Sequence, residues 1–165
     1  MRSIADLIKQ LDAGWAALQA AQPRVEAGAP WPLADKFDNS PEAYWFPPEV
    51  LAHVADLLER WLRVVNTIVD GSPEPVEFGH PSQDRLAGIE RNRRMTIPEL
   101  YALIEGNIAA MRARLTQLSD MDLAKRARHV RKGETTLGEI VSDSVTGHID
   151  EHARQIESLL ADAGW

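Results

Sequence analysis

The 165 residues of the chain include no cysteine. This absence excludes disulfide bonds, thiolate ligands for a metal, a cysteine nucleophile and a redox role through the protein's own thiols. Long apolar runs are missing too, because no stretch approaches the roughly 20 residues that span a bilayer. Near the N-terminus, Asp6, Lys9 and Asp12 interrupt the apolar residues before the core of a signal peptide can form. We therefore expect a cytoplasmic protein that does not associate with membranes.

Positive charge is also in short supply, with 18 Lys and Arg against 25 Asp and Glu. Nucleic-acid affinity comes largely from cationic contacts to phosphates, and no G-x-G-x-x-G or P-loop motif is present. We expect no nucleic-acid partner, and an interface built on Arg91, Arg93, Arg94 and the basic run 125–132 is the least favoured alternative. The apolar content of 44% and charged content of 26% indicate one globular domain over residues 1–165.

What the chain does contain is apolar periodicity. Four segments place apolar residues at steps of three and four, the pattern of amphipathic helices. They run from Ser3 to about Ala21, from Pro47 or Pro48 to Asp70, from Ile97 to about Leu118, and from Thr136 to about Ala163. An N-cap at Ser3 and capping boxes at Thr96 with Glu99 and at Thr136 with Glu139 mark three of the starts. We expect an all-α fold, a four-helix bundle with long crossover loops.

The connections between these segments differ in character. Residues 23–48 contain six prolines and read as a loop, whose aromatic residues predict packing over the bundle or a roof over a pocket: Trp31, Phe37, Tyr44, Trp45 and Phe46. A second proline-rich loop follows Asp70 and extends through "GSPEPVEFGHPSQDRLAG". Within 119–136 the sequence allows a small hairpin that turns at Lys132–Gly133.

Two histidines lie on the apolar face of the last predicted helix. His148 and His152 are four residues apart, so their side chains project from one face about one turn apart. The same face carries apolar residues that predict burial: Leu137, Val141, Val145, Ile156, Leu159 and Leu160. One metal ion could contact both rings. Histidine pairs also occur on exposed helices with no ligand role, so the pair needs a third ligand.

His53 is the candidate for that third ligand. It stands one turn before Leu57 and two turns before Trp61, so it faces the same interior as the histidine pair. Ligand sites in helical bundles are built from side chains on facing helices, and three histidines from two helices can meet in this way. The alternative for His53 is a histidine at the edge of the core that is hydrogen-bonded to a backbone carbonyl.

These residues carry a family resemblance. The segment "PPEVLAHVADLLERW", followed about a hundred residues later by "ETTLGEIVSDSVTGHIDEHARQIESLL", resembles the DinB/YfiT-like superfamily, with one histidine in the second helix and an H-x3-H pair in the fourth. The resemblance covers the chain from Pro48 onward. It implies a left-handed four-helix bundle that is usually dimeric, with a divalent metal bound by His53, His148 and His152.

The resemblance also bears on function. Superfamily members are reported with zinc, nickel or iron, and some act as thiol-cofactor transferases or isomerases. Three imidazoles leave coordination positions for water or substrate, and the bound ion can activate water or bind a thiolate. We expect a metal-dependent hydrolase or small-thiol transferase that acts on a small molecule of unknown identity. The alternative is a non-catalytic, metal-stabilised homodimer that binds a small ligand or a partner protein.

Some polar residues near the histidines have possible supporting roles. A ligating imidazole usually needs an acceptor for its other N–H group, and Glu49, Asp56 and Gln155 are candidates, although each could simply be solvated. The basic run "KRARHVRK" (125–132) is either a solvated hairpin or a rim that attracts an anionic substrate. His80 and His129 fall in expected loops, and the sequence assigns them no role.

Overall fold

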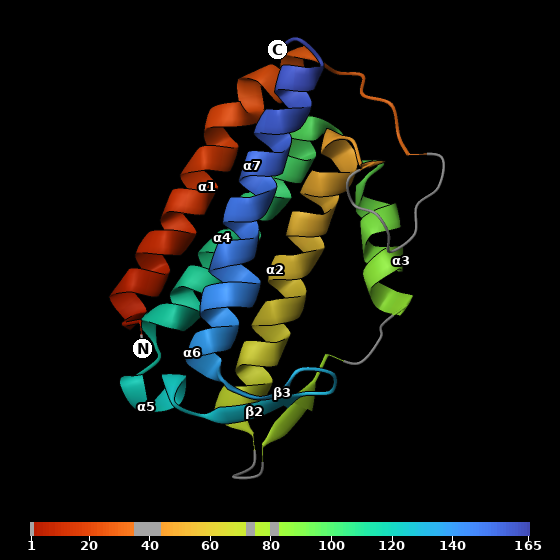
Figure 1. Ribbon diagram of the computed structural model, residues 1–165. Coiled ribbons are helices and arrows are strands. Elements are labelled where there is room, and N and C mark those ends of the chain that lie inside the picture. The colour runs from red at the N-terminus through yellow and green to blue at the C-terminus, as the bar shows by residue number, and fades with distance from the viewer. Residues whose placement is uncertain (1, 35–43, 72–74, 80–82) are drawn as a thin grey trace.

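The computed structural model describes residues 2–34, 44–71, 75–79 and 83–165. Its long helices lie side by side (Figure 1): α1 (Ile4–Ala27), α2 (Pro47–Asp70), α4 (Ile97–Thr116) and α7 (Gly147–Asp162). Helix α1 packs against α4 and α7, and α2 packs against the same two helices. The fold is therefore mostly helical. No described helix is both long and apolar enough to cross a membrane.

The core lies between these helices and follows the apolar periodicity of each one. Buried residues of α1 recur at helical spacing: Leu7, Leu11, Leu18, Ala21 and Val25. Burying such a side chain contributes about 1.5–3 kcal/mol. The buried hydroxyl of Tyr101 on α4 donates to the carbonyl oxygen of Leu18 at 3.0 Å, and burial raises the pKa of that hydroxyl. The hydroxyl therefore stays protonated and ties α4 to α1.

Helix α1 is longer than the sequence pattern predicts. We expected it to end near Ala21 because Pro23 lacks an N–H group and disfavours a helix interior. Instead α1 continues through Pro23 to Ala27 and is capped at Gly28, whose N–H donates to the carbonyl of Arg24. The fully buried Val25 lies four residues after Ala21. Its burial continues the apolar stripe and outweighs the missing hydrogen bond.

The predicted helix starts agree with the structure. Ser3 accepts a hydrogen bond from the N–H of Asp6, and Thr96 accepts one from that of Glu99. Helix α2 begins with Pro47 and Pro48, where a missing N–H costs little because the first turn has no intrahelical acceptor.

A small sheet at one end of the molecule corrects the all-α expectation. The sheet has the order β1 (Val76–Phe78), β2 (Arg126–His129) and β3 (Gly133–Thr136). Strands β2 and β3 form the predicted hairpin, and Gly133, which follows the turn as the first residue of β3, has φ +87°, a conformation that glycine adopts readily. Strand β1 pairs with β2 in parallel. The sequence pattern placed β1 in a loop, because three residues carry too little periodicity to predict a strand.

Two shorter helices also fall where loops were expected. Helix α3 (Gln83–Asn92) packs against α2 and fully buries Ile89, and α5 (Asp120–Leu123) precedes the hairpin. Leu86 and Ile89 are the main apolar residues of α3. That is too few to produce a helical pattern, so tertiary packing stabilises this helix.

The last predicted helix is continuous in sequence pattern but not in structure. It opens as α6 (Leu137–Glu139) with the predicted cap at Thr136, widens into the π-helical segment η2 (Ile140–Thr146) and continues as α7. The N–H of Gly147 donates to the carbonyl of Ser142, five residues earlier, and an added Cβ at Gly147 would lie 3.0 Å from that oxygen. Such π-helical turns are frequent at functional sites, and this one ends at Thr146, two residues before His148.

Candidate metal centre

The first residue of the candidate site is His53 in α2. It is buried, with 1% of its surface exposed, and it lies on the face of α2 that the sequence pattern predicted. The ring of Trp45, just before α2, meets the ring of His53 in a T-shaped contact with centroids 5.5 Å apart. This aromatic residue of the segment 23–48 therefore packs on the bundle, as the sequence predicted, and contacts His53 there.

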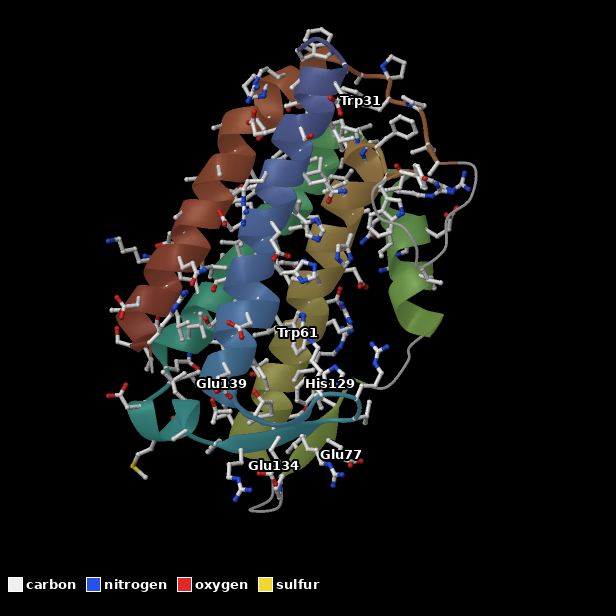
Figure 2. All side chains as sticks on the ribbon, viewed as in Figure 1. Trp31, Trp61, Glu77, His129, Glu134 and Glu139 are labelled. Carbon is white, nitrogen blue, oxygen red and sulfur yellow. The ribbon has the colours of Figure 1, made fainter. Side chains whose placement is uncertain are left out.

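The rest of that loop is divided between the core and the surface. Trp31 packs at the end of the molecule opposite Trp61 and the sheet (Figure 2), and its ring N–H donates to the carbonyl of Val25 at 2.7 Å. Tyr44 is exposed, and Phe37 lies outside the described residues.

The predicted histidine pair meets His53 across the space between α7 and α2. Ring centroids lie 4.7 Å apart for His148 and His152, 5.5 Å for His53 and His148, and 4.8 Å for His53 and His152. One ligand atom from each ring lies within 4.8 Å of the other two. The structure thus brings together the three residues that the sequence singled out, which we call the histidine cluster.

The donor set of the cluster fits a divalent metal ion. A Zn–N bond is about 2.0–2.1 Å, so two nitrogens on one ion are at most about 4.2 Å apart. The ligand atoms of the cluster, within 4.8 Å of one another, lie close to that span. Neutral imidazole suits zinc, nickel and iron alike, so the donor set does not select among these ions.

Gln155 supplies the partner that a ligating histidine needs. The Nδ1 of His152 lies 2.8 Å from Oε1 of Gln155, one turn further along α7. An amide oxygen can only accept, so this contact places the proton on Nδ1 and leaves the lone pair on Nε2. Hydrogen bonds of this kind fix the tautomer and orientation of metal-binding histidines. Gln155, one of the three residues that the sequence offered as acceptors, therefore has a hydrogen bond to a histidine of the cluster.

The other two candidates make contacts with other described residues. The buried carboxylate of Glu49 accepts from the N–H groups of Ala34 and Phe46 and pairs with Arg93 at 2.8 Å. Its role is to join α2 to the preceding loop and to α3. Asp56 is also largely buried, and its carboxylate lies 3.7 Å from the guanidinium of Arg60. The sequence could not distinguish these networks, because each partner is distant along the chain or on the next turn.

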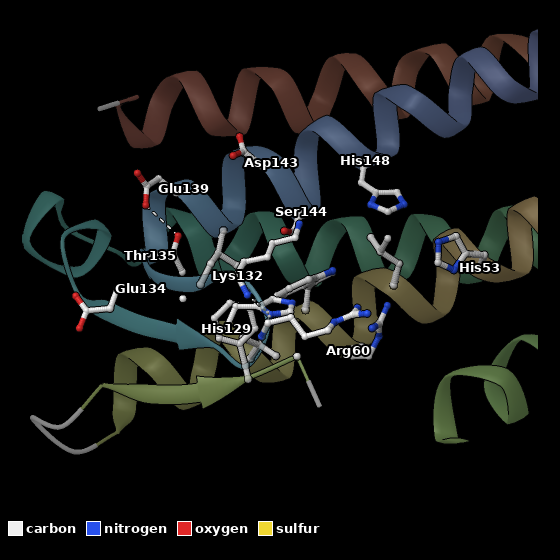
Figure 3. Close-up of a pocket in the computed structure, with 18 of the residues that line it drawn as sticks. His53, Arg60, His129, Lys132, Glu134, Thr135, Glu139, Asp143, Ser144 and His148 are labelled. Carbon is white, nitrogen blue, oxygen red and sulfur yellow. Dashed lines mark hydrogen bonds between the residues drawn. The ribbon is translucent and has the colours of Figure 1, made fainter. Parts of the chain in front are cut away.

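A cavity of 1130 Å³ opens from the histidine cluster toward the sheet. His53 and His148 line it at one end, and the hairpin lines it at the other (Figure 3). Aromatic and aliphatic side chains of α2 and β1 form an apolar wall: Leu57, Trp61, Val64 and Phe78. The cluster therefore faces a space that can admit a small molecule.

His129, to which the sequence assigned no role, forms part of this cavity. Its ring packs on Phe78 with centroids 5.1 Å apart, and its Nδ1 accepts from the N–H groups of Arg131 at 3.0 Å and Lys132 at 3.4 Å. Burial, then the charges of Lys132 and Arg131, lower the pKa of His129. The sequence holds a signal for this position, because His129 lies two residues after the buried Ala127 and therefore shares its face of β2. His80 lies outside the described residues.

These features define a mostly helical protein with a three-histidine cluster at the end of a cavity. The sequence matches the family model of the DinB superfamily over residues 10–156, and the chain belongs to this superfamily. The predicted resemblance is thereby confirmed.

One solved structure with a similar fold is the "Crystal structure of the mycothiol-dependent maleylpyruvate isomerase". Its TM-score is 0.63 at 14% sequence identity, over 94% of this chain and 63% of that chain. At this identity the likeness concerns the fold alone, and the chain spans less than two thirds of that protein's length. No curated protein matches the sequence.

Proposed function

We propose that this protein is a metal-dependent enzyme that transfers a small thiol to an electrophile. The observation that carries the proposal is the position of the histidine cluster: three imidazole nitrogen donors at the inner end of a cavity that a small molecule can enter. A divalent ion held by His53, His148 and His152 would favour the thiolate form of a bound thiol or polarise a carbonyl group. The mycothiol dependence named for the structural neighbour supports a thiol as one reactant.

The size of the cavity supports a reaction between two molecules. Small-molecule pockets usually measure about 300–1,000 Å³, and this cavity of 1130 Å³ has room for a thiol beside a second molecule. The chain has no cysteine, so the thiol must come from solution.

The surrounding residues have defined tasks in this proposal. Gln155 holds His152 in the tautomer that presents Nε2 to the cluster, and the edge contact of Trp45 covers His53 and limits access of water. We further propose that the four long helices, α1, α2, α4 and α7, form one four-helix bundle that holds the histidine cluster.

The test begins with metal content. Protein purified without a histidine tag should contain about one divalent ion per chain by elemental analysis, and His152→Ala should lose it. His129→Ala is the matched control, because His129 lines the cavity outside the cluster, and it should keep the ion. An ion-free wild type under metal-replete conditions would contradict the proposal.

The reaction is tested on the metal-loaded protein with glutathione as thiol and 1-chloro-2,4-dinitrobenzene as electrophile. Loss of free thiol should depend on the protein and disappear in His152→Ala. Hydrolysis of 4-nitrophenyl acetate without thiol consumption would identify a hydrolase instead. A metal-loaded protein inactive in both assays would favour the non-catalytic alternative.

We also propose that the protein is a homodimer, as the family resemblance implies. Sedimentation at micromolar concentration should give about twice the chain mass of 18.4 kDa. A single species of that mass would contradict the dimer.

A further inference from the structure

The cavity has a cationic region that the histidine cluster does not explain. Arg60 lines it from α2, and Arg131 and Lys132 line it from the hairpin turn, next to His129. In Figure 3, Arg60, His129 and Lys132 lie between the two labelled histidines of the cluster and Glu134. No described carboxylate lies within salt-bridge distance of Arg131 or Lys132. The structure thus gathers basic groups from distant parts of the sequence in the cavity that opens from the candidate metal site.

Arg60 is held in place within this region. Its guanidinium lies 3.7 Å from the buried carboxylate of Asp56 and 5.9 Å from the ring centroid of Trp61. Gly88 of α3 leaves the space for that carboxylate, since an added Cβ would lie 2.4 Å from Oδ1 of Asp56. A planar guanidinium positioned in this way is suited to a carboxylate, whose two oxygens match its fork of N–H donors.

Two of the three acidic residues that line the same cavity have partners of their own. Glu134 pairs with Arg126 on the hairpin, and Glu139 accepts from Thr135 and from the N–H of Thr136. In Figure 3, both lie beyond the cationic groups as seen from the cluster. Asp143 also lines the cavity, but it is exposed on η2. Among the described lining residues, the three cations Arg60, Arg131 and Lys132 therefore outnumber the remaining acidic side chain, Asp143, and this region attracts an anion.

We infer that this region binds the carboxylate of a small organic acid through Arg60 and Lys132, with the rest of the molecule extending toward the histidine cluster. Arg60 follows His53 by two helical turns, about 10 Å along the helix axis, and long side chains on a helix lean toward its N-terminus. The acid therefore needs only a few carbon atoms to reach from Arg60 to the cluster. The role of this acid as the electrophile rests on the proposed function, whereas its binding does not.

The test measures binding of succinate by calorimetry, in zinc-loaded protein and in protein treated with a chelator. Succinate should bind in both, and the neutral diamide of succinate should not. Arg60→Gln with Lys132→Gln should weaken succinate binding about tenfold or more, because hydrogen bonds to charged groups are lost. Arg128→Gln is the matched control, since Arg128 is an exposed residue of the same hairpin outside the cavity, and it should bind as the wild type does.

Several results would overturn the inference. The first is that succinate does not bind detectably to the wild type. The second and third are that succinate binds equally to the double variant, or that the diamide binds as well as succinate. The fourth is that inorganic phosphate binds more tightly than succinate, which would identify the preferred ligand group as a phosphoryl group instead of a carboxylate. Arg60→Lys keeps the positive charge and should retain part of the affinity for succinate. Partial binding by this variant would show that the protein is folded and that the lost affinity comes from the guanidinium. Metal content of the same samples separates the proposals. If the wild type holds no metal but succinate binding depends on Arg60 and Lys132, the metal-dependent function fails and the carboxylate site stands.

Discussion

The two ends of the cavity are built in different ways. The histidine end takes its residues from two long helices, and a local contact between His152 and Gln155 orients one of them. The hairpin end depends on long-range pairing, since Val76 of β1 lies opposite Ala127 of β2. Helical spacing links sequence to geometry over one or two turns, whereas strand pairing joins residues of any separation. Chemistry at helical spacing is therefore readable from the sequence, whereas the pairing of β1 with the distant hairpin is not.

The largest expected effect removes a ligand from the histidine end. His53→Ala should reduce metal affinity by more than about 100-fold, which exceeds the 10–100-fold typical of losing an outer hydrogen-bond partner. Calorimetric titration of zinc into metal-free protein measures this. Val54→Ala is the control, because it changes a buried core residue on the next position of α2 and should keep zinc affinity.

The same variant should lose its response to a chelator. A bound ion at 100 times its dissociation constant stabilises the fold by about 2.7 kcal/mol, which corresponds to about 5–10 °C for a chain of this size. Chelation should lower the melting temperature of the wild type by that amount and leave His53→Ala unchanged. An unchanged wild type that is shown to have lost its metal would mean that the cluster does not hold a stabilising ion.

The second prediction tests whether the local contact matters at the histidine end. Gln155→Leu removes the acceptor from His152 and should weaken zinc binding by about 10–100-fold. Gln155→Glu keeps an acceptor oxygen and should bind zinc at least as well as the wild type. Equal affinity in all three proteins would show that Gln155 does not orient the ligand.

The third prediction concerns the hairpin end. Gly79 has φ +83°, and an added Cβ would lie 2.5 Å from Nε2 of His129. Gly79→Ala should therefore lower the free energy of unfolding by about 2 kcal/mol, of which roughly 1 kcal/mol is backbone strain. Zinc affinity should not change. Urea denaturation measures the loss, which should fall to about 1 kcal/mol in a His129→Ala background because the clash is removed.

Gly106 provides the control for this substitution. It lies on an exposed face of α4, and an added Cβ would meet no described atom within 4 Å. Gly106→Ala should stabilise the helix by about 0.5–1 kcal/mol. If both substitutions shift stability in the same direction, the clash at His129 is not the cause.

These comparisons also explain what the sequence could and could not predict. Caps at Ser3, Thr96 and Thr136 are local patterns, so the helix starts were predictable, as was the turn at Gly133. The histidine cluster was predictable because His148 and His152 share a face and His53 lies on the apolar stripe of α2. Each of these predictions depends on residues that are only a few positions from one another in the sequence. The exception is the packing of α2 against α7, which brings His53 to the histidine pair.

The remaining features depend on tertiary packing. Helix α1 passes Pro23 because Val25 is buried, and α3 forms against α2 despite a weak apolar pattern. Nothing in the spacing of Ile140–Thr146 indicates a π-helix. Arg60 and the hairpin turn line one cavity although they are distant along the chain, and no local pattern indicates this. These are effects that tertiary contacts impose on segments with weak or contrary local preferences.

The smallest effect is expected at the cap of α5, just before the hairpin. Hydrogen bonds from the side chain and the backbone N–H of Ser119 lower the pKa of Asp122 to about 2, from an ordinary value of 3.8. Because the folded-state pKa is depressed, this stabilisation is present above about pH 4 and is lost as the pH falls toward 2. Solvent screening limits it to about 1 kcal/mol. Asp122→Asn should therefore lower stability at pH 6 and make little difference at pH 2, as measured by urea denaturation, whereas Asp120→Asn, outside the capping box, should change neither value. An equal loss at both pH values would show that the cap does not depend on the charge of Asp122.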